Sequence, residues 1–390
     1  MLLQALKLSD DRDEEKVLLL VGPNGAGKST MLRKLAMQYK NERPIAIVCN
    51  TAYDRFVNLR GVKRLSASRS FGAPRTVVKA AVAKALASDG SSFFQISTVL
   101  EFCGYRPRFG IRLVQTWRDE WKAEQLNRDY TATERDPELQ HAIEVSRLRV
   151  NGPIFWVDGN LPAFEFSIGR DLGTVLEFER RLQTHHFLSQ IKLFLEKVDG
   201  TVIELKEASS GELALISSLI FLIINIGKNY LVLIDEPENS LHPKWQREYV
   251  DLLLATFRYQ QITAVIATHA PLIVTGALPS KSDVVDVYSI NEGEAEKLDL
   301  HAEGEPQSSI EEILWRAFEV VTPANHYVSE RLVEAVSEFE AGRRSQSDVY
   351  VLIESMKAES FDSKQSAFFD AVKALVDDVS ENPENSGGPD

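Results

Sequence analysis

A glycine-rich segment near the start of the chain has the residue types and spacing of a phosphate-binding loop. Gly22-Pro23-Asn24-Gly25-Ala26-Gly27-Lys28-Ser29 fits the pattern GxxxxGK[ST] and stands between an apolar run and a helical segment. Glycines let consecutive backbone N–H groups converge on a phosphate chain, and the following helix adds its positive N-terminal end. We expect Lys28 at the β- and γ-phosphates, the Ser29 hydroxyl at Mg²⁺ and Thr30 at the α-phosphate. The expected nucleotide-binding residues are Asn24, Gly25, Ala26, Gly27, Lys28, Ser29 and Thr30.

Two consecutive carboxylates, Asp235 and Glu236, follow the apolar run 230–234. Carboxylates at the end of a buried strand are costly unless they hold a cation or perform a hydrogen-bonding task. We therefore expect Asp235 to hold Mg²⁺ together with Ser29. Glu236 is the candidate general base that polarises an attacking water molecule.

A third polar segment, Glu207-Ala208-Ser209-Ser210-Gly211-Glu212, precedes the apolar stretch 213–226. Serine is favoured where a helix begins, and the N-terminus of a helix can receive a phosphate. The segment is therefore either a phosphate contact or only a good helix start. Its position shortly before Asp235 favours the phosphate contact.

Two separated parts of the chain alternate between apolar runs and helical segments. The expected strands are 16–21, 44–48, 230–234, 262–267 and 284–290, and the expected helices in these parts are 28–39, 213–226 and 244–257. Continuous apolar runs followed by helices are typical of parallel strands that are covered on both faces. The sequence therefore predicts an α/β fold with a mostly parallel, doubly wound sheet.

The segment between these parts, 66–199, predicts an inserted and mostly helical arm. Helical periodicity occurs at 77–87, 137–148 and 176–195, and a strand-like run occurs at 153–157. The expected domains are a first lobe (1–65), the arm (66–199), a second lobe (200–295), a helical C-terminal region (296–376) and an acidic tail (377–390). The tail is rich in Asp, Glu, Asn, Pro, Gly and Ser, a composition that predicts disorder.

Charge and cysteine content limit the partners and the compartment. The net charge of −13 excludes a protein that coats nucleic acid with its whole surface. A basic stretch from Arg55 to Lys84 nevertheless contains no acidic residue, and it could bind DNA, dock an acidic partner or form a solvated helix face. Cys49 and Cys103 have neither disulfide nor zinc-site spacing, and the longest apolar stretch, 213–226, is too short for a bilayer. We expect a cytoplasmic protein without a membrane anchor.

The order of these motifs resembles the ATPase heads of ABC proteins in the SMC and overcoming-lysogenization-defect (OLD) groups. The motifs that carry it are the phosphate loop, Ser209-Ser210-Gly211-Glu212, Asp235-Glu236, Ser240-Leu241-His242-Pro243 and Thr268-His269. The resemblance implies an ATP hydrolase that binds ATP and Mg²⁺ and forms a homodimer. It assigns 209–212 to a signature that contacts the γ-phosphate held by the second protomer, and it places the loop 237–243 along the dimer interface. It also implies that His269 senses the γ-phosphate and orients the water beside the catalytic Glu236.

Three features depart from the pattern of these heads. Ala208 replaces the leucine that usually opens the signature, and Ser210 fills a position often occupied by glycine. The heads also carry an Mg²⁺-ligating glutamine after the first lobe. Gln95 and Gln115 are both candidates for it, and the sequence favours neither.

Two classes of function fit these motifs. The segment 49–56 resembles that of small bacterial anti-phage ATPases such as the Septu type, which work with an HNH nuclease. The first expectation is an ATPase that dimerises on ATP and gates a separate nuclease effector in anti-phage defence. The alternative is an SMC-like, DNA-binding repair or maintenance ATPase without a toxic partner. A nuclease within this chain is not expected, because no DxD follows 349–354 and no histidine follows His326.

Overall fold

The computed structural model describes most of the chain as two compact units. The described residues are 15–51, 53–66, 73–87, 91–116, 136–158, 163–258, 260–277, 283–298, 326–358 and 363–381. Of these, the first unit contains Leu18–Lys28 and the residues from Thr268 onward, and the second contains Ser29–Ala267 with the few residues up to Val17. Within the described residues, no helix is both long and apolar enough to cross a membrane.

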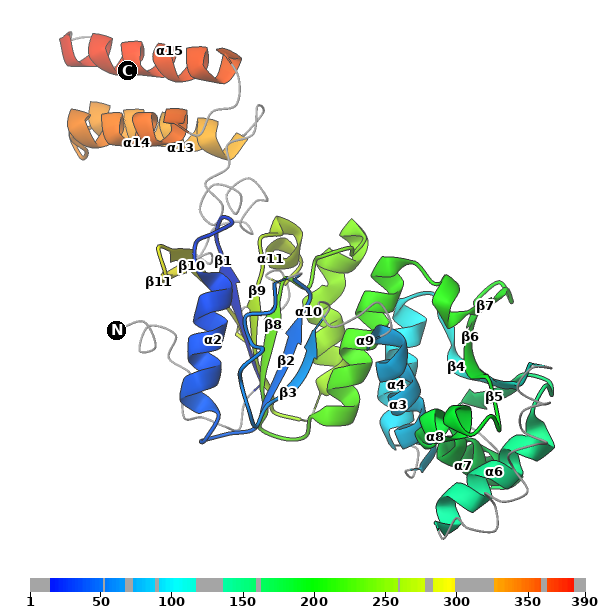
Figure 1. Cartoon of the computed structure of the whole chain (residues 1–390). Helices are drawn as coiled ribbons and strands as arrows, with labels where there is room; N and C mark the ends of the chain where they lie inside the picture. Colours follow the sequence, from blue (N-terminus) through cyan, green and yellow to red (C-terminus); the bar gives the residue numbers. More distant parts are fainter. Residues whose placement is uncertain are drawn as a thin grey trace. The chain divides into compact units, whose positions relative to one another are not determined.

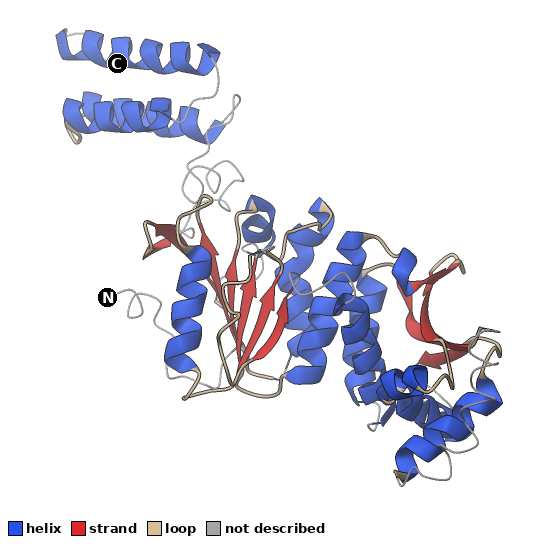
Figure 2. Ribbon diagram, in the orientation of Figure 1, coloured by secondary structure: helices blue, strands red, loops and turns tan. Residues whose placement is uncertain are grey.

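Seven strands among the described residues form a large, mostly parallel sheet (Figure 2). They are β1 (Lys16–Val21), β2 (Ile45–Cys49), β3 (Lys63–Ser66), β8 (Leu231–Asp235), β9 (Thr263–Ala267), β10 (Val285–Asn291) and β11 (Glu294–Leu298). Their order is β11-β10-β1-β9-β8-β2-β3. The five apolar runs of the sequence are confirmed as strands. Strands β3 and β11 were not predicted because both are polar, as befits strands that end the sheet.

In the second unit, parallel pairing brings the ends of three buried strands together. Strand β8 lies between β2 and β9, with Asp235 opposite Cys49 on one side and Ala267 on the other. Helices α2 (Lys28–Tyr39), α9 (Ser210–Asn225) and α10 (Pro243–Phe257) accompany these strands. Figure 1 shows α2 on one side of the sheet and α9 and α10 on the other. The predicted α/β fold with a mostly parallel, doubly wound sheet is therefore confirmed.

The inserted segment is built from helices and, unexpectedly, an antiparallel sheet. Its helices are α3 (Ala73–Ala87), α4 (Ser91–Phe102), α6 (Pro137–Arg149), α7 (Ala163–Glu177) and α8 (Glu179–Thr184). The sheet has the order β5-β4-β6-β7, formed by β4 (Tyr105–Val114), β5 (Phe155–Asp158), β6 (Gln190–Lys197) and β7 (Val202–Glu204), after which the short helix η2 (Leu205–Glu207) follows. The predicted helices at 77–87 and 137–148 and the strand at 153–157 are present, whereas the predicted helix at 176–195 is wrong.

The error at 176–195 has a physical reason. Ile191, Leu193 and Leu195 are buried and alternate with less buried residues, which is the period of a strand. The preceding α7 and α8 end before this alternation begins. The prediction of one helix over 176–195 therefore combined the end of α7, the short helix α8 and most of the strand β6.

In the first unit, strands β10 and β11 form a tight hairpin. Strands β10 and β11 pair antiparallel from Asn291 opposite Glu294, and α11 (Pro271–Ala277) precedes them. The two turn residues, Glu292 and Gly293, have φ of 48° and 82°. Positive φ at both positions is typical of a two-residue turn that matches the twist of the strands.

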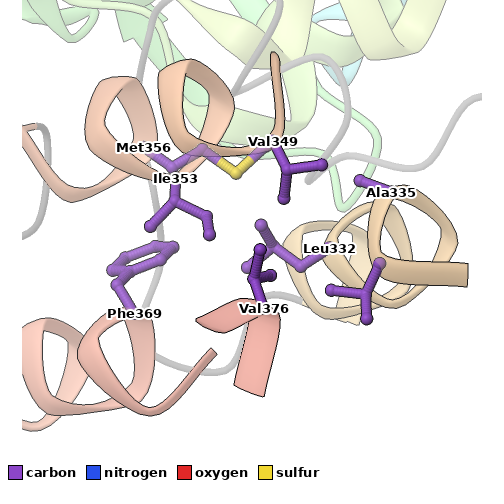
Figure 3. Packing of buried hydrophobic residues seen from close by; sticks show 8 residues of the cluster. Leu332, Ala335, Val349, Ile353, Met356, Phe369 and Val376 are labelled. Atoms are coloured by element: carbon purple, nitrogen blue, oxygen red, sulfur yellow. The ribbon is translucent and has the colours of Figure 1, made fainter. Parts of the chain in front are cut away.

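The C-terminal region consists of α13 (His326–Glu340), α14 (Gln346–Ala358) and α15 (Ser363–Glu381). Their buried side chains form one apolar cluster (Figure 3), made of Leu332, Ala335, Val336, Val349, Ile353, Met356, Phe369 and Val376. Within the predicted helical region 296–376, residues 296–298 belong to β11, the three helices occupy most of 326–358 and 363–376, and 299–325 lies outside the described residues. Predicted disorder from Asp377 is wrong up to Glu381, because Gln346 and Tyr350 on α14 hydrogen-bond to the Asp377 carboxylate. Residues 382–390 lie outside the described part.

Replacing Phe369 by alanine tests this cluster. Phe369 is 1% exposed, and we expect its removal to destabilise the three helices by about 3 to 5 kcal/mol because a cavity remains. Hydrogen exchange of peptides from 326–358 and 363–381 measures the change. Leu375→Ala on the same helix, at a side chain that is 51% exposed, is the control and should change exchange far less. Equal effects of the two substitutions would contradict the packing.

Candidate nucleotide-binding site

The phosphate loop joins β1 to α2 and is held in the first unit by the β10–β11 hairpin. The Gly293 N–H donates to the Ala26 carbonyl at 2.9 Å. A Cβ on Gly22 would lie 2.5 Å from the Ile290 carbonyl oxygen, and one on Gly27 would lie 3.2 Å from the Gly293 Cα. Gly22 and Gly27 also have φ of 143° and 102°, which side chains rarely permit. Only glycine therefore fits these two positions.

Lys28 lies against the loop that it follows. Its ammonium donates to the carbonyls of Gly22 at 2.7 Å and Pro23 at 3.0 Å, and the residue is 6% exposed. Asn24 and Gly25 are exposed at the tip of the loop. No acidic residue occurs between Lys16 and Asn41. The loop thus offers an ammonium group and backbone amides with no nearby carboxylate in its own sequence, which is the composition of an anion site.

In the second unit, Ser29 meets the buried Asp235 at the end of β8. The Ser29 hydroxyl donates to the Asp235 carboxylate at 2.9 Å, and Asp235 is 0% exposed. The Cys49 thiol lies 4.0 Å from the other carboxylate oxygen. Burial raises the pKa of Cys49 to about 11, with the Asp235 charge adding to the rise, so the thiol is neutral near pH 7.

This pair fits the donor set of Mg²⁺. A hydroxyl and a carboxylate are hard oxygen donors, and Mg²⁺ commonly takes one or two protein oxygens and completes its shell with water and nucleotide phosphates. No cluster of three His, Cys, Asp or Glu side chains that could hold a metal exists in the described part of the chain. Ser29 and Asp235 would therefore hold Mg²⁺ only together with a nucleotide.

Glu236 directly follows β8 in a strained backbone conformation. Its φ is 50°, and its N–H donates to the Ala267 carbonyl at 2.9 Å. The Asn239 side chain donates to the Glu236 carboxylate at 3.0 Å and to the Asn50 carbonyl at 3.2 Å. Left-handed backbone at a residue other than glycine costs of order 1 to 3 kcal/mol and is concentrated at functional sites. These hydrogen bonds hold the carboxylate at the end of the strand.

The predicted signature forms the start of α9. The Ser209 hydroxyl accepts from the Glu212 N–H at 3.2 Å, and the Ser209 N–H donates to the Glu212 carboxylate at 2.7 Å, which makes a capping box. Burial acts to raise the pKa of Glu212, but hydrogen bonds from Ser209 outweigh it and the pKa is lowered. Ser209 and Ser210 are exposed, whereas Gly211 is buried. The segment is therefore a well-capped helix start, and its contact with a phosphate stays a prediction.

Gly211 explains why the signature and the loop after Glu236 lie together. A Cβ on Gly211 would lie 2.2 Å from the Ser240 carbonyl oxygen, and Ser240 has φ of 69°. The next residue but one, His242, caps α10 by accepting from the Lys244 N–H at 3.2 Å. His242 is thus the structural cap of α10.

His269 lies in the first unit, just after β9. The preceding Thr268 donates its N–H to the Leu20 carbonyl at 3.0 Å, and its hydroxyl accepts from the Ala270 N–H at 3.0 Å. Thr268 is fully buried and His269 is half-buried. These bonds fix the His269 backbone beside the end of β1, the strand that leads into the phosphate loop.

The two glutamine candidates are engaged elsewhere in the second unit. The Gln95 amide donates to the Thr256 carbonyl at 2.8 Å, and the Gln115 amide donates to the His186 carbonyl at 2.9 Å. Neither of these two hydrogen bonds involves Asp235. Sequence reasoning also gave no role to Arg55, whose guanidinium donates to the Thr30 hydroxyl at 3.1 Å. The sequence feature that could have pointed to Arg55 is a basic residue soon after the second predicted strand.

Comparisons with known proteins find likenesses to ATPase domains. Residues 108–275, less than half of the chain, match the family described as "AAA domain, putative AbiEii toxin, Type IV TA system". That segment includes Asp235, Glu236 and His269 but not the phosphate loop. The search of curated proteins returns no match.

Three solved structures illustrate the structural likeness. The SMC head domain from Thermotoga maritima is 15% identical, with a TM-score of 0.22, over 28% of this chain and 40% of that one. An ATP-binding cassette of an ABC transporter in its ADP conformation is 13% identical, with a TM-score of 0.29, over 78% and 85%. An SMC head bound to the C-winged helix domain of ScpA is 13% identical, with a TM-score of 0.28, over 74% and 91%.

Gly22→Ala tests the geometry of the phosphate loop. The added Cβ would collide with the Ile290 carbonyl, so we expect the affinity for a fluorescent ATP analogue to fall at least about tenfold. Gly227→Ala is the matched control, because a Cβ at that position would meet no atom within 4 Å and we expect no change there. Wild-type affinity in Gly22→Ala would show that the loop does not bind the nucleotide in this conformation.

Proposed function

We propose that the chain is an ABC-type ATPase that dimerises on ATP. The hydrogen bond between Ser29 and Asp235 carries this proposal, because it joins the residue after the loop lysine to a buried carboxylate 206 positions away. Lys28 and Ser29 are consecutive, so the loop and Asp235 belong to one chemical centre. A lysine, a hydroxyl and a buried aspartate are the set that binds a nucleoside triphosphate with Mg²⁺.

Each residue of this centre has a role that its surroundings support. Lys28 exchanges its bonds to the loop carbonyls for the β- and γ-phosphates. Glu236 accepts the proton of the attacking water, and Asn239 holds its carboxylate in position. His269 senses the γ-phosphate, Thr30 binds the α-phosphate, and Arg55 adds positive charge beside Thr30. Ser29 and Asp235 would hold Mg²⁺, which would neutralise part of the phosphate charge.

The signature acts on a second copy of the chain. Ser209 and Ser210 are exposed at the N-terminus of a 16-residue helix, where backbone N–H groups and the helix dipole favour a phosphate. Gly211 brings this helix start against the loop 237–243. We propose that both segments face the partner protomer, whose γ-phosphate the signature contacts.

We further propose that ATP state gates a separate effector, with an HNH-type nuclease in anti-phage defence as the leading candidate. Several basic side chains of the stretch Arg55–Lys84 already have partners within the chain, which supports a protein partner over DNA. Lys79 pairs with Glu179 at 2.6 Å, Lys84 donates to the Ile224 carbonyl, and Arg64 lies 3.6 Å from Asp54. Cations that are already paired contribute little to phosphate binding.

Glu236→Gln tests the catalytic assignment and the dimer together. We expect ATP turnover to fall at least about 100-fold, because the general base is lost while binding is kept. The ATP-bound variant should accumulate as a dimer in size-exclusion chromatography with light scattering. Lys28→Ala should remain monomeric, because it loses the phosphate contact, and Glu248→Gln on α10 is the neutral control. A Glu236→Gln variant that stays monomeric with ATP would overturn the dimer proposal.

Affinity purification of the tagged protein expressed with its neighbouring genes tests the effector proposal. We expect a nuclease-like neighbour to copurify, and its activity on plasmid DNA to change between wild type and Glu236→Gln. Recovery of the protein alone, together with ATP-stimulated DNA bridging by the purified chain, would instead establish the maintenance ATPase.

A further inference from the structure

A cleft of about 710 Å³ in the inserted segment has no role in the proposed ATPase centre. It lies in the second unit, and its lining residues come from α3, α7, α8, β6, β7 and η2 (Figure 1). Five cationic side chains line it: Arg75, Lys79, Arg180, Lys192 and Lys206. Three carboxylates also line it: Glu177, Glu179 and Glu204. The cleft is large enough for a drug-sized ligand or a short peptide segment.

The three lysines of the cleft are all ion-paired. Lys79 pairs with Glu179 at 2.6 Å, while Lys192 and Lys206 both pair with Glu204 at 3.2 and 2.7 Å. Glu179 also accepts from the Ile191 N–H at 3.0 Å, so it connects β6 to α8. Because two lysines share Glu204, these pairs leave one positive charge in excess.

Arg75 and Arg180 differ from the lysines. They stand on α3 and α8, both are exposed, and neither makes a hydrogen bond or ion pair within the described residues. Glu177 is the one cleft carboxylate in the same situation among the described residues. The two unpaired guanidinium groups, on different walls of the cleft, outnumber the one unpaired carboxylate. The cleft therefore carries a net positive charge. An anionic group would satisfy both arginines.

The chemistry of the cleft favours carboxylates over phosphates. The phosphate loop contains no acidic residue between Lys16 and Asn41, whereas the cleft contains three glutamates, which repel the double charge of one phosphate group more strongly than the single charge of one carboxylate. An arginine guanidinium binds a carboxylate with two parallel hydrogen bonds. Glu177 and the amide group of Gln190 offer acceptors and donors for a peptide backbone, whereas the Gln183 amide already donates to Glu179 at 3.2 Å.

We propose that this cleft docks an acidic peptide segment of a partner protein, with Arg75 and Arg180 each binding a carboxylate. The inference rests on the proposed gating of a separate effector and names the chemistry by which that effector is held. Arg75 belongs to the basic stretch Arg55–Lys84, of which the proposed ATPase centre uses only Arg55. The cleft is thus an interaction surface separate from the nucleotide.

Fluorescence anisotropy with a labelled hexaglutamate peptide tests the proposal on the full chain. At about 150 mM salt, where exposed charges are screened within about 8 Å, we expect saturable binding by the wild type. The double variant Arg75→Glu, Arg180→Glu should bind at least about tenfold more weakly. Arg112→Glu, at an exposed arginine on β4 outside the cleft, is the matched control and should bind like the wild type.

The opposite results are equally specific. Equal peptide affinity in the double variant and the wild type would overturn the proposal, and so would displacement of the peptide by tripolyphosphate but not by unlabelled hexaglutamate. ATP turnover of the double variant should match that of the wild type, because both arginines lie outside the nucleotide centre. Arginine-dependent peptide binding by a chain that fails to hydrolyse ATP would refute the ATPase and leave the cleft standing. Normal turnover with no peptide binding would do the reverse.

Discussion

The hydrogen bond from Ser29 to Asp235 is the interaction on which the candidate centre depends. A carboxylate that is 0% exposed needs a donor or a cation, since its burial without one is costly. The bond reaches from the start of α2 to the end of β8 at 2.9 Å. Asp235 can be there only because β8 lies between β2 and β9 with their ends in register. Parallel pairing therefore places Asp235 where the Ser29 hydroxyl reaches it.

Backbone strain occurs at the predicted motifs of each unit. Gly22 and Gly27 take conformations that other residues rarely adopt, and Glu236 and Ser240 have positive φ without being glycine. Close approaches of the hairpin to the loop, and of Ser240 to Gly211, keep these conformations in place. Strained segments persist when the surrounding structure determines them fully. The centre is thus built from segments that could not hold their shape alone.

The inserted segment has a different construction. Strands β4 and β6 pair at the middle of its antiparallel sheet, and Gly110 on β4 allows a close approach, since a Cβ there would lie 2.6 Å from an Ile154 methyl carbon. Helices α3 and α8 are joined beside this sheet by the pair of Lys79 and Glu179. The same arrangement leaves Arg75 and Arg180 without partners among the described residues. The cleft therefore contains both ion pairs that hold its elements together and two arginines without such a partner among the described residues.

The sequence by itself determined the central strands, the helices around them and the residues of the candidate centre. Continuous apolar runs and the pattern from Gly22 to Ser29 are local signals, so no distant contact is needed to recognise them. Tertiary structure decided the rest. In strand β6, buried residues alternate with partly exposed ones, and the strand directly follows helices in the sequence. Strands β3 and β11 are polar and lie at the edges of the sheet. These three strands are therefore identified only by their pairing with neighbouring strands. The bond of Ser29 to Asp235, the contact of Gly211 with Ser240 and the cleft at Arg75 all join residues far apart in the chain, and no local pattern encodes such distances.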